Sequence, residues 1–529
     1  MWSTSECIES RRIELPIVKD QSDSRMVGSH ASSSSGRNIE QSRHQVDSMP
    51  RIIATVLLGL ILAQPVTAQK AADHPRVKQA LELARVWLDA QRAYSDIPGL
   101  SAAIVLDQDV IWSGALGMAD VERGTPATTS TIYSICSISK LFTSVALMQL
   151  RDQGKVRLDD PVGKHLPWFS SLKRLKPEAG EITVEGILTH ASGLPRETDH
   201  PYWSAPDFPF PTRQQVIEGL SHQEALYPAE TYFQYSNLGL TLAGEIVSAA
   251  SGMPYDAYVR KNILEPLGLS STTPEMPEAE KGRRLATGYS ALDRKGKRTP
   301  MPFYLAKGIA PAAGYASTVE DLARFASWQF RVLAGASQEV LRQSTLREMQ
   351  RVHWTDPDFE TTWGLGFSIW RNSNRTFVGH GGSCPGYRTQ LLLKPDEKIA
   401  TVFASNAMVN SGLFAQELYD IVAPALTQAV KGTAAKPTDT SLYAYTGTYS
   451  AQPWGSETAV VTWEEGLAML GLPSNDPLNA LTKLKKTGEH TFRRIRRDNE
   501  LGEAITFQMG PDGKAVRYVQ HGNRYPRVR

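Results

Sequence analysis

Hydrophobic residues recur three or four positions apart in several long stretches of the chain. In the range 75–93 this spacing predicts an amphipathic helix, and Pro75 stands at a favourable first helical position. The same pattern predicts helices over 138–153, 236–250 and 413–428.

Other stretches carry short runs of β-branched and apolar residues, which predict strands. A hairpin is expected from 100–106 and 110–112, and further strands from 364–370, 387–394 and 399–405. Ser317 and Glu320 have the spacing of a capping box, which predicts a helix start between these strands.

The last part of the chain has shorter predicted elements than the rest. Residues 431–441 are polar and contain Gly, Pro and several Thr, which is typical of a linker. Residues 442–529 show only short strands and turns, which predicts a small antiparallel β domain. Its strands are expected at 443–449, 459–463, 467–470, 504–509 and 515–519.

The first part of the chain is predicted to be removed or disordered. Residues 1–48 are polar and rich in Ser, either a disordered extension or a misread start. Residues 49–68 have the positive start, short apolar run and small-residue exit of a signal peptide. Translation from Met49 and cleavage after Ala68 predict a periplasmic or secreted protein. The alternative is a cytoplasmic leader with a signal anchor.

Composition excludes several functional classes. The chain has 529 residues, with 57 Lys and Arg against 55 Asp and Glu, a net charge of +2. A nucleic-acid-binding protein usually has a larger basic excess, so no nucleic-acid partner is expected. Three cysteines exclude a disulfide-rich scaffold or a cysteine zinc array. The histidines lack metal-binding spacing, so neither a metal nor a cofactor is expected. No membrane anchor is expected after signal cleavage.

One pair of residues has the pattern of a nucleophile and its base. Ser137 and Lys140 are three positions apart at the predicted start of the 138–153 helix, so their side chains share one face. A serine hydroxyl attacks only when a neighbouring base takes its proton. A lysine serves as that base only when burial or neighbouring charges lower its pKa.

Two later motifs and one signature strengthen this hypothesis. Tyr235-Ser236-Asn237 precedes a predicted helix, and His380-Gly381-Gly382 lies in a predicted strand. Residues 188–195 read Leu-Thr-His-Ala-Ser-Gly-Leu-Pro. The order S-x-x-K, Y-x-N, H-x-G resembles the serine β-lactamase and penicillin-binding-protein superfamily, in particular its class C-like branch. The resemblance covers residues 75–430.

This resemblance implies a fold of the α+β class. The fold is an antiparallel sheet with helices on both faces and a helical subdomain, as in β-lactamases and transpeptidases. The spacing Tyr445-x-Gly447-x-Tyr449 resembles the lipocalin-like β-barrel domain that follows many members. The branch includes class C β-lactamases, esterases, D,D-carboxypeptidases and D-aminopeptidases.

The resemblance also implies roles for the motif residues. Ser137 is the expected acylated nucleophile, and Lys140 the residue that accepts or shares its proton. Tyr235 is expected to act as a phenolate or a proton relay, and Asn237 to bind Lys140 and substrate. Whether Lys140 or Tyr235 is the general base stays open.

The third motif supplies the remaining site residues. His380 stands where many members carry lysine, and it is expected to bond Tyr235 or a substrate carboxylate. Gly382, like Asn237 and His380, is expected to bind substrate or to support its binding. The backbone N–H groups of Ser137 and Ser383 are the expected oxyanion hole. His190, in the 188–195 signature, is expected to be mainly structural.

Two cysteines flank these motifs. Cys136 precedes the nucleophile and Cys384 lies two residues after Gly382. Certain class A carbapenem-hydrolysing β-lactamases have cysteines at the same offsets, and these are bridged. The resemblance therefore implies a Cys136–Cys384 disulfide.

The predicted function is a serine hydrolase that forms an acyl-enzyme at Ser137. The candidate substrates are esters, D-amino-acid peptides and β-lactams, small molecules or peptides in each case. The H-G-G motif favours an esterase or peptidase over an efficient β-lactamase. The alternative is a penicillin-binding sensor that is acylated without turnover. The sequence leaves the oligomeric state and the role of the C-terminal domain open.

Overall fold

The computed structural model describes residues 68–173 and 179–529. The predicted extension 1–48 and nearly all of the predicted signal peptide 49–68 lie outside the described residues. The described part begins with the short helix α1 (Ala68–Ala72). No helix within this described part is long and apolar enough to cross a membrane.

A nine-stranded sheet lies at the centre of the part of the chain that precedes residue 431. Its strands are β1 (Gly99–Leu106), β2 (Asp109–Asp120), β3 (Thr125–Pro126), β6 (Trp354–Thr355), β7 (Thr362–Trp363), β8 (Ser368–Asn372), β9 (Arg375–Cys384), β10 (Tyr387–Lys394) and β11 (Ile399–Ser405). Their order in the sheet is β3-β2-β1-β11-β10-β9-β8-β7-β6, and neighbouring strands are antiparallel. A separate small sheet pairs β4 (Tyr133–Ser134) with β5 (Ala316–Ser317).

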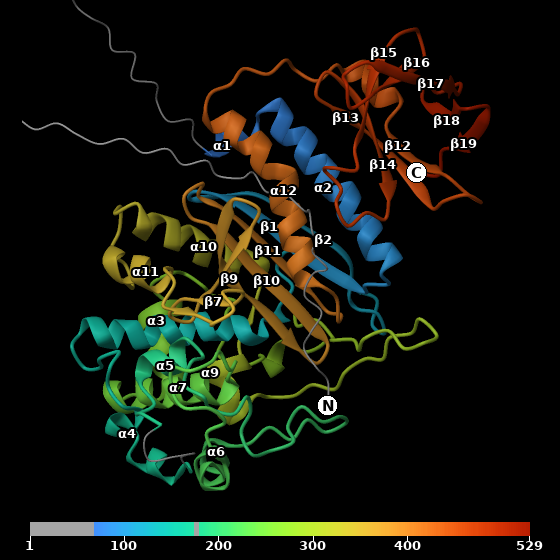
Figure 1. Ribbon diagram of the computed structural model, residues 1–529. Helices are drawn as coiled ribbons and strands as arrows, with labels where there is room; N and C mark the ends of the chain where they lie inside the picture. The colour runs from blue at the N-terminus through green and yellow to red at the C-terminus, as the bar shows by residue number, and fades with distance from the viewer. Residues whose placement is uncertain (1–67, 174–178) are drawn as a thin grey trace, which may run out of the picture. The chain divides into compact units, whose positions relative to one another are not determined.

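Helices cover both faces of the large sheet, which explains why every residue of β1 is buried. Leu100, Ala102 and Ile104 pack toward α2 (Pro75–Tyr94) and α12 (Ser411–Val430). These two helices lie side by side (Figure 1). The intervening residues Ala103 and Val105 pack into the core on the opposite face. Alternation along one strand therefore serves two hydrophobic cores.

The second core contains the helices that build the site. The helices on this side are α3 (Ser139–Asp152), α4 (Val162–His165), α5 (Val184–Leu188), α6 (Arg213–Gly219), α7 (Asn237–Ser251), α8 (Tyr255–Val259), α9 (Ala310–Ala313), α10 (Val319–Leu333) and α11 (Gln343–Met349). Helix α10 packs on β1 and β11, whereas α3, α7 and α9 pack on one another. The latter group belongs to the helical subdomain.

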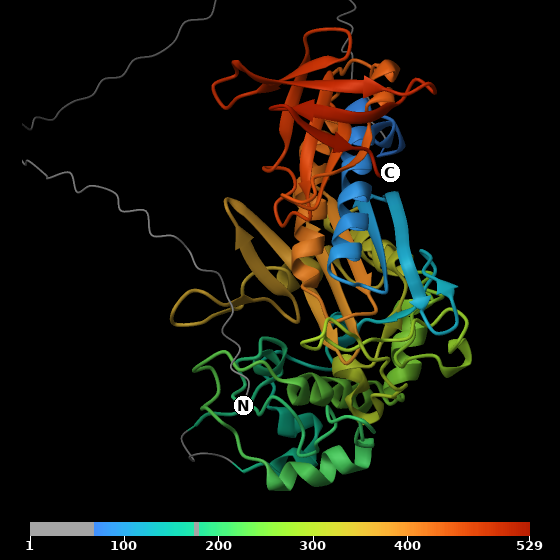
Figure 2. The same cartoon turned by 90° about the vertical axis from the view of Figure 1, so that its right-hand side faces the viewer.

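The C-terminal residues form an eight-stranded antiparallel sheet that is nearly closed, seen at the red end of the chain in Figure 2. A bridge between Tyr449 and Arg527 joins the first strand to the chain end. The strands of this C-terminal sheet are β12 (Gly447–Ser450), β13 (Glu457–Trp463), β14 (Gly466–Leu472), β15 (Thr482–Lys486), β16 (Thr491–Ile495), β17 (Leu501–Met509), β18 (Ala515–Gln520) and β19 (Asn523–Pro526). The architecture confirms the expected α+β class with its β-barrel-like appendage.

Helix α2 is bound by this C-terminal sheet as well as by α12. The Gln79 side chain donates to the Glu464 carbonyl at 3.0 Å and accepts from the Glu464 N–H at 2.9 Å. Trp87 Nε1 donates to the Ser474 carbonyl at 2.7 Å. Side chains of β13 and β14 contribute to the same core as α2. The predicted division at residues 431–441 stays a proposal, because both sides of it share a core.

Three sequence expectations need local correction. The N-cap of α10 is Thr318, whose hydroxyl accepts from the Asp321 N–H, whereas Glu320 accepts from Thr129. Thr318 is itself a good cap, so the helix begins one residue later than Ser317 predicts. The strand expected at 364–370 begins at Ser368. The strand expected at 443–449 starts only at Gly447 and follows a 3-10 turn.

Candidate active site

Ser137 lies in a 3-10 turn, η1 (Cys136–Ile138), that leads directly into α3. The preceding residue, Cys136, has a φ of +50°, in the left-handed region that non-glycine residues rarely adopt. A disulfide joins Cys136 to Cys384 on β9, with 5.8 Å between the Cα atoms. The implied disulfide is therefore present, and it joins η1, which carries Ser137, to β9, which carries the third motif.

Lys140 follows one turn later, and its side chain is fully buried. Its Nζ lies 3.2 Å from Ser137 Oγ, 2.7 Å from Asn237 Oδ1 and 2.8 Å from the carbonyl oxygen of Ala312 on α9. Burial lowers the pKa of Lys140 well below its ordinary value. The charge of Glu197 opposes this effect, and the charge of Arg196 adds to it. The arrangement favours a neutral amine beside the Ser137 hydroxyl.

Tyr235 and Asn237 stand at the start of α7. Ser236 is the N-cap of this helix, and its hydroxyl accepts from the Gly239 N–H. Lys140 Nζ lies 4.9 Å from the centre of the Tyr235 ring. Burial raises the pKa of Tyr235 above its usual value, although a hydrogen bond with Ser137 and the charge of Arg196 oppose the increase. A protonated phenol is therefore favoured.

His380 lies on β9 with its ring centre 6.2 Å from that of Tyr235. Its Nδ1 is 2.6 Å from the carbonyl oxygen of Gly381, which can only accept, so Nδ1 carries a proton. Burial, with a smaller effect from the charge of Lys140, lowers the pKa of His380 to about 3. The ring is therefore neutral near pH 7 and presents Nε2 as an acceptor.

Gly382 lies where β9 contacts η1. A Cβ atom at this position would come within 2.1 Å of Thr389 Oγ1, which explains the glycine. Ser383, the next residue, pairs with Arg388 of β10 and has an exposed side chain. The structure thus brings β9 alongside η1. An oxyanion hole from the N–H groups of Ser137 and Ser383 remains a prediction.

His190 has a largely structural environment. Its Nδ1 accepts from the Ser236 N–H at 3.1 Å, and its ring lies 4.3 Å from that of Tyr235, centre to centre. Trp363 packs edge-on against His190 and His380. The rings of His190 and Trp363 both pack against Tyr235 and restrict its orientation.

Sequence reasoning missed two neighbouring residues that reach the site. Glu197 accepts both contacts from Asn237 Nδ2, each at 2.9 Å. Arg196 places its guanidinium 4.9 Å from the centre of the Tyr235 ring. Both directly follow the 188–195 signature, and that position was the only signal available for them in the sequence.

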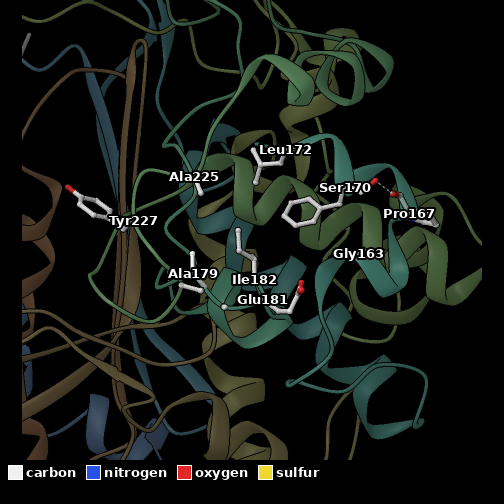
Figure 3. A pocket seen from close by; sticks show the side chains of 12 residues that line it. Gly163, Pro167, Ser170, Leu172, Ala179, Glu181, Ile182, Ala225 and Tyr227 are labelled. Carbon is white, nitrogen blue, oxygen red and sulfur yellow. Dashed lines mark hydrogen bonds between the residues drawn. The ribbon is translucent and has the colours of Figure 1, made fainter. Parts of the chain in front are cut away.

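A separate pocket of about 180 Å³ opens in the helical subdomain (Figure 3). Phe169, Leu172 and Ile182 supply apolar lining, and none of the predicted site residues contributes to it. Among the described residues, no group of three or more His, Cys, Asp or Glu side chains is placed to hold a metal ion.

Several known proteins are similar to this chain in sequence over most of its length. Beta-lactamase-like protein 2 of Dictyostelium discoideum is 27% identical over 395 residues, which cover 73% of this chain and 71% of that protein. Penicillin-binding protein 4 of Amycolatopsis lactamdurans is 26% identical over 384 residues, covering 69% of this chain and 96% of that protein.

Solved structures give the same picture. The octameric penicillin-binding protein homologue from Pyrococcus abyssi has a TM-score of 0.58 at 25% identity, covering 84% of this chain and 99% of that one. A D-stereospecific amidohydrolase from Streptomyces sp. has a TM-score of 0.52 at 25% identity, covering 67% and 99%. The sequence profile named Beta-lactamase matches residues 87–424, most of the chain. The chain belongs to the beta-lactamase family.

Proposed function

We propose that this protein is a hydrolase that forms an acyl-enzyme at Ser137 on ester or amide bonds. The observation that carries the proposal is the contact between Ser137 Oγ and a buried, pKa-lowered Lys140. Serine becomes an effective nucleophile when a neighbouring base accepts its proton.

The hydrogen bonds of Lys140 support its role as that base. A neutral amine has two N–H groups and one lone pair. The Asn237 Oδ1 and Ala312 carbonyl oxygens can only accept, so they take the two N–H groups. The lone pair then faces Ser137 Oγ. Of the two alternatives left open by the sequence, this geometry favours Lys140 over Tyr235.

The proposed reaction balances with these groups. Ser137 Oγ bonds to the substrate carbonyl carbon while its proton passes to Lys140 Nζ. The C–O or C–N bond then breaks, the leaving group takes the proton of the Tyr235 hydroxyl, and the proton held by Lys140 replaces it on Tyr235. Water attacks the acyl ester, releases the acid and returns a proton to Ser137. The raised pKa of Tyr235 suits a relay better than a standing phenolate.

The proposed substrates are esters and D-amino-acid amides or peptides, with β-lactams as a weaker candidate. A neutral His380 cannot attract a substrate carboxylate as a lysine does at the third motif. The D-stereospecific name of the Streptomyces relative supports the choice of D-amino-acid derivatives. The Cys136–Cys384 disulfide supports a periplasmic or secreted location, where such bonds persist.

A substrate panel tests this proposal. Residues 69–529 would be assayed with nitrophenyl acetate, D-alanine amide, D-alanyl peptides and nitrocefin, beside Ser137→Ala. We expect turnover of esters or D-amino-acid amides by the wild type, and none by the variant. Activity that survives in Ser137→Ala contradicts the proposal. A burst of product without steady turnover supports the sensor alternative instead.

A further inference from the structure

The Asn237 side chain must adopt one particular orientation if Lys140 is to be a base. Its amide has an accepting oxygen and a donating NH₂ group that occupy nearly the same space. With Oδ1 toward Lys140, as in the structure, the amide accepts an N–H and leaves the lysine lone pair for Ser137. With the amide reversed, the Asn237 NH₂ group would face Lys140 Nζ. The lysine could then bind it only by turning its lone pair toward Asn237 and away from Ser137.

Glu197 supplies the group that distinguishes the two orientations. Both of its carboxylate oxygens lie 2.9 Å from Asn237 Nδ2. An ionised carboxylate can only accept hydrogen bonds. Reversal of the amide would direct Oδ1 at two negatively charged oxygens, which is strongly unfavourable in a partly buried position.

The Glu197 carboxylate is itself held in place. The hydroxyl of Tyr202, a fully buried residue, donates to Glu197 Oε2, and Arg196 Nε lies 3.3 Å from Oε1. The Gln223 side chain donates to the Glu197 backbone carbonyl at 2.8 Å. The carboxylate therefore has a fixed position on the far side of Asn237 from Lys140.

We propose that Glu197 is a positioning residue that locks the Asn237 amide and thereby directs the Lys140 lone pair at Ser137. This inference rests on the acyl-enzyme proposal and adds a residue to it. Glu197 acts through Asn237 and does not need to touch substrate.

The charge of Glu197 gives this role a second measurable sign. Its negative charge raises the pKa of Lys140 against the dominant effect of burial. Lys140 acts as a base only when neutral, so activity falls as pH decreases through its pKa. Removal of the charge lowers that pKa further, and the acid limb of the pH profile then moves to lower pH.

The test compares Glu197→Gln with the wild type. The glutamine keeps the size of the side chain, but its amide offers a donor as well as an acceptor and no longer selects one orientation of Asn237. We expect kcat/KM to fall about 10-fold to 100-fold, with the acid limb displaced to lower pH. Glu185→Gln is the matched control, because the Glu185 carboxylate pairs with His353 Nδ1 at 2.7 Å and not with Asn237 or Lys140. We expect it to keep the wild-type profile.

A double-mutant cycle distinguishes a lock from general structural damage. If Glu197 acts through Asn237, Glu197→Gln should cost far less activity in an Asn237→Ala background than in the wild type. An unchanged kcat/KM in Glu197→Gln overturns the proposal. So does a loss that is equal in both backgrounds and leaves the acid limb in place. Failure of the acyl-enzyme proposal looks different, because wild-type activity would then not depend on Ser137.

Discussion

The carbonyl oxygen of Ile135 lies so close to Gly382 that a Cβ atom on residue 382 would come within 2.3 Å of it. This contact sets the separation between the turn that carries Ser137 and the strand that carries Ser383. Neither partner can move away freely, because the Cys136–Cys384 disulfide joins the residue after Ile135 to the second residue after Gly382.

Gly382→Ala should therefore disturb both stability and activity. Because the clash is with backbone and with Thr389, β9 must shift, and we expect a loss of about 1–3 kcal/mol in the free energy of unfolding. Turnover should fall by a larger factor than in Gly471→Ala, a strand glycine with open space around it. Denaturant unfolding and kcat/KM measure the two effects. Wild-type behaviour of Gly382→Ala would show that the close approach is not needed.

Removal of the disulfide should destabilise the folded protein. Its cysteines are 248 positions apart, so the bond restricts a long loop in the unfolded chain. We expect Cys136→Ser/Cys384→Ser to lose about 2–5 kcal/mol of stability. Thermal unfolding with and without a reducing agent provides the measurement. The reductant should lower the midpoint of the wild type and leave that of the double variant unchanged. An equal response of both proteins would contradict a structural bridge.

His380 should remain neutral from pH 5 to pH 9, because burial lowers its pKa to about 3. Its imidazole proton resonances, assigned by comparison with His380→Gln, should show no titration in this range. The acid limb of kcat/KM should also keep its position in His380→Gln. A midpoint near pH 6 for this ring would mean that it can carry charge toward a substrate carboxylate.

Glu275 should make folding stability depend on pH. Burial raises its pKa from 4.5 to about 7, although the Ala306 and Lys307 N–H groups donate to its carboxylate. The protonated form is thus favoured in the folded state. The contribution of protonated Glu275 to the free energy of unfolding is complete below about pH 4.5 and is lost as the pH rises toward 7.

Thermal midpoints of the wild type and Glu275→Gln between pH 4 and pH 8 check this prediction. The wild type should lose stability relative to the variant over that interval, and the difference should level off above pH 7. A constant difference would mean that Glu275 has an ordinary pKa. The residue matters for the site because the turn that it holds leads into α9, whose Ala312 carbonyl binds Lys140.

The spacing of apolar residues predicted the long helices, whose formation depends on residues close together in the sequence. Helices α2, α3, α7 and α12 agree with their expected ranges within two residues, because an apolar stripe at helical spacing needs only one partner surface. Strands β15 and β16 were missed. They read Thr-Lys-Leu-Lys-Lys and Thr-Phe-Arg-Arg-Ile, and their charged residues are largely exposed on the outside of the barrel-like sheet.

The candidate site likewise contains residues that the sequence predicted and others that it did not. The motif residues Ser137, Lys140 and Asn237 are in contact in the structure, as the family resemblance led us to expect. Glu197 was not predicted, because its only mark in the sequence is that it closely follows the 188–195 signature, and this does not show what its carboxylate contacts. Only the fold brings it to Asn237.

Helix α2 packs on C-terminal strands that contribute no candidate site residue. The part of the chain that folds together is therefore larger than the part that carries the site. The bonds of α2 to Glu464 and Ser474 span 385 and 387 positions. Such distant partners meet late, because a long loop must close before they are in contact. A chain that ends after α12 would contain Ser137, Lys140 and Tyr235, yet it would expose to water the part of the α2 surface that β13 and β14 cover. Synthesis of β13 and β14 is therefore needed before the outer surface of α2 is fully covered.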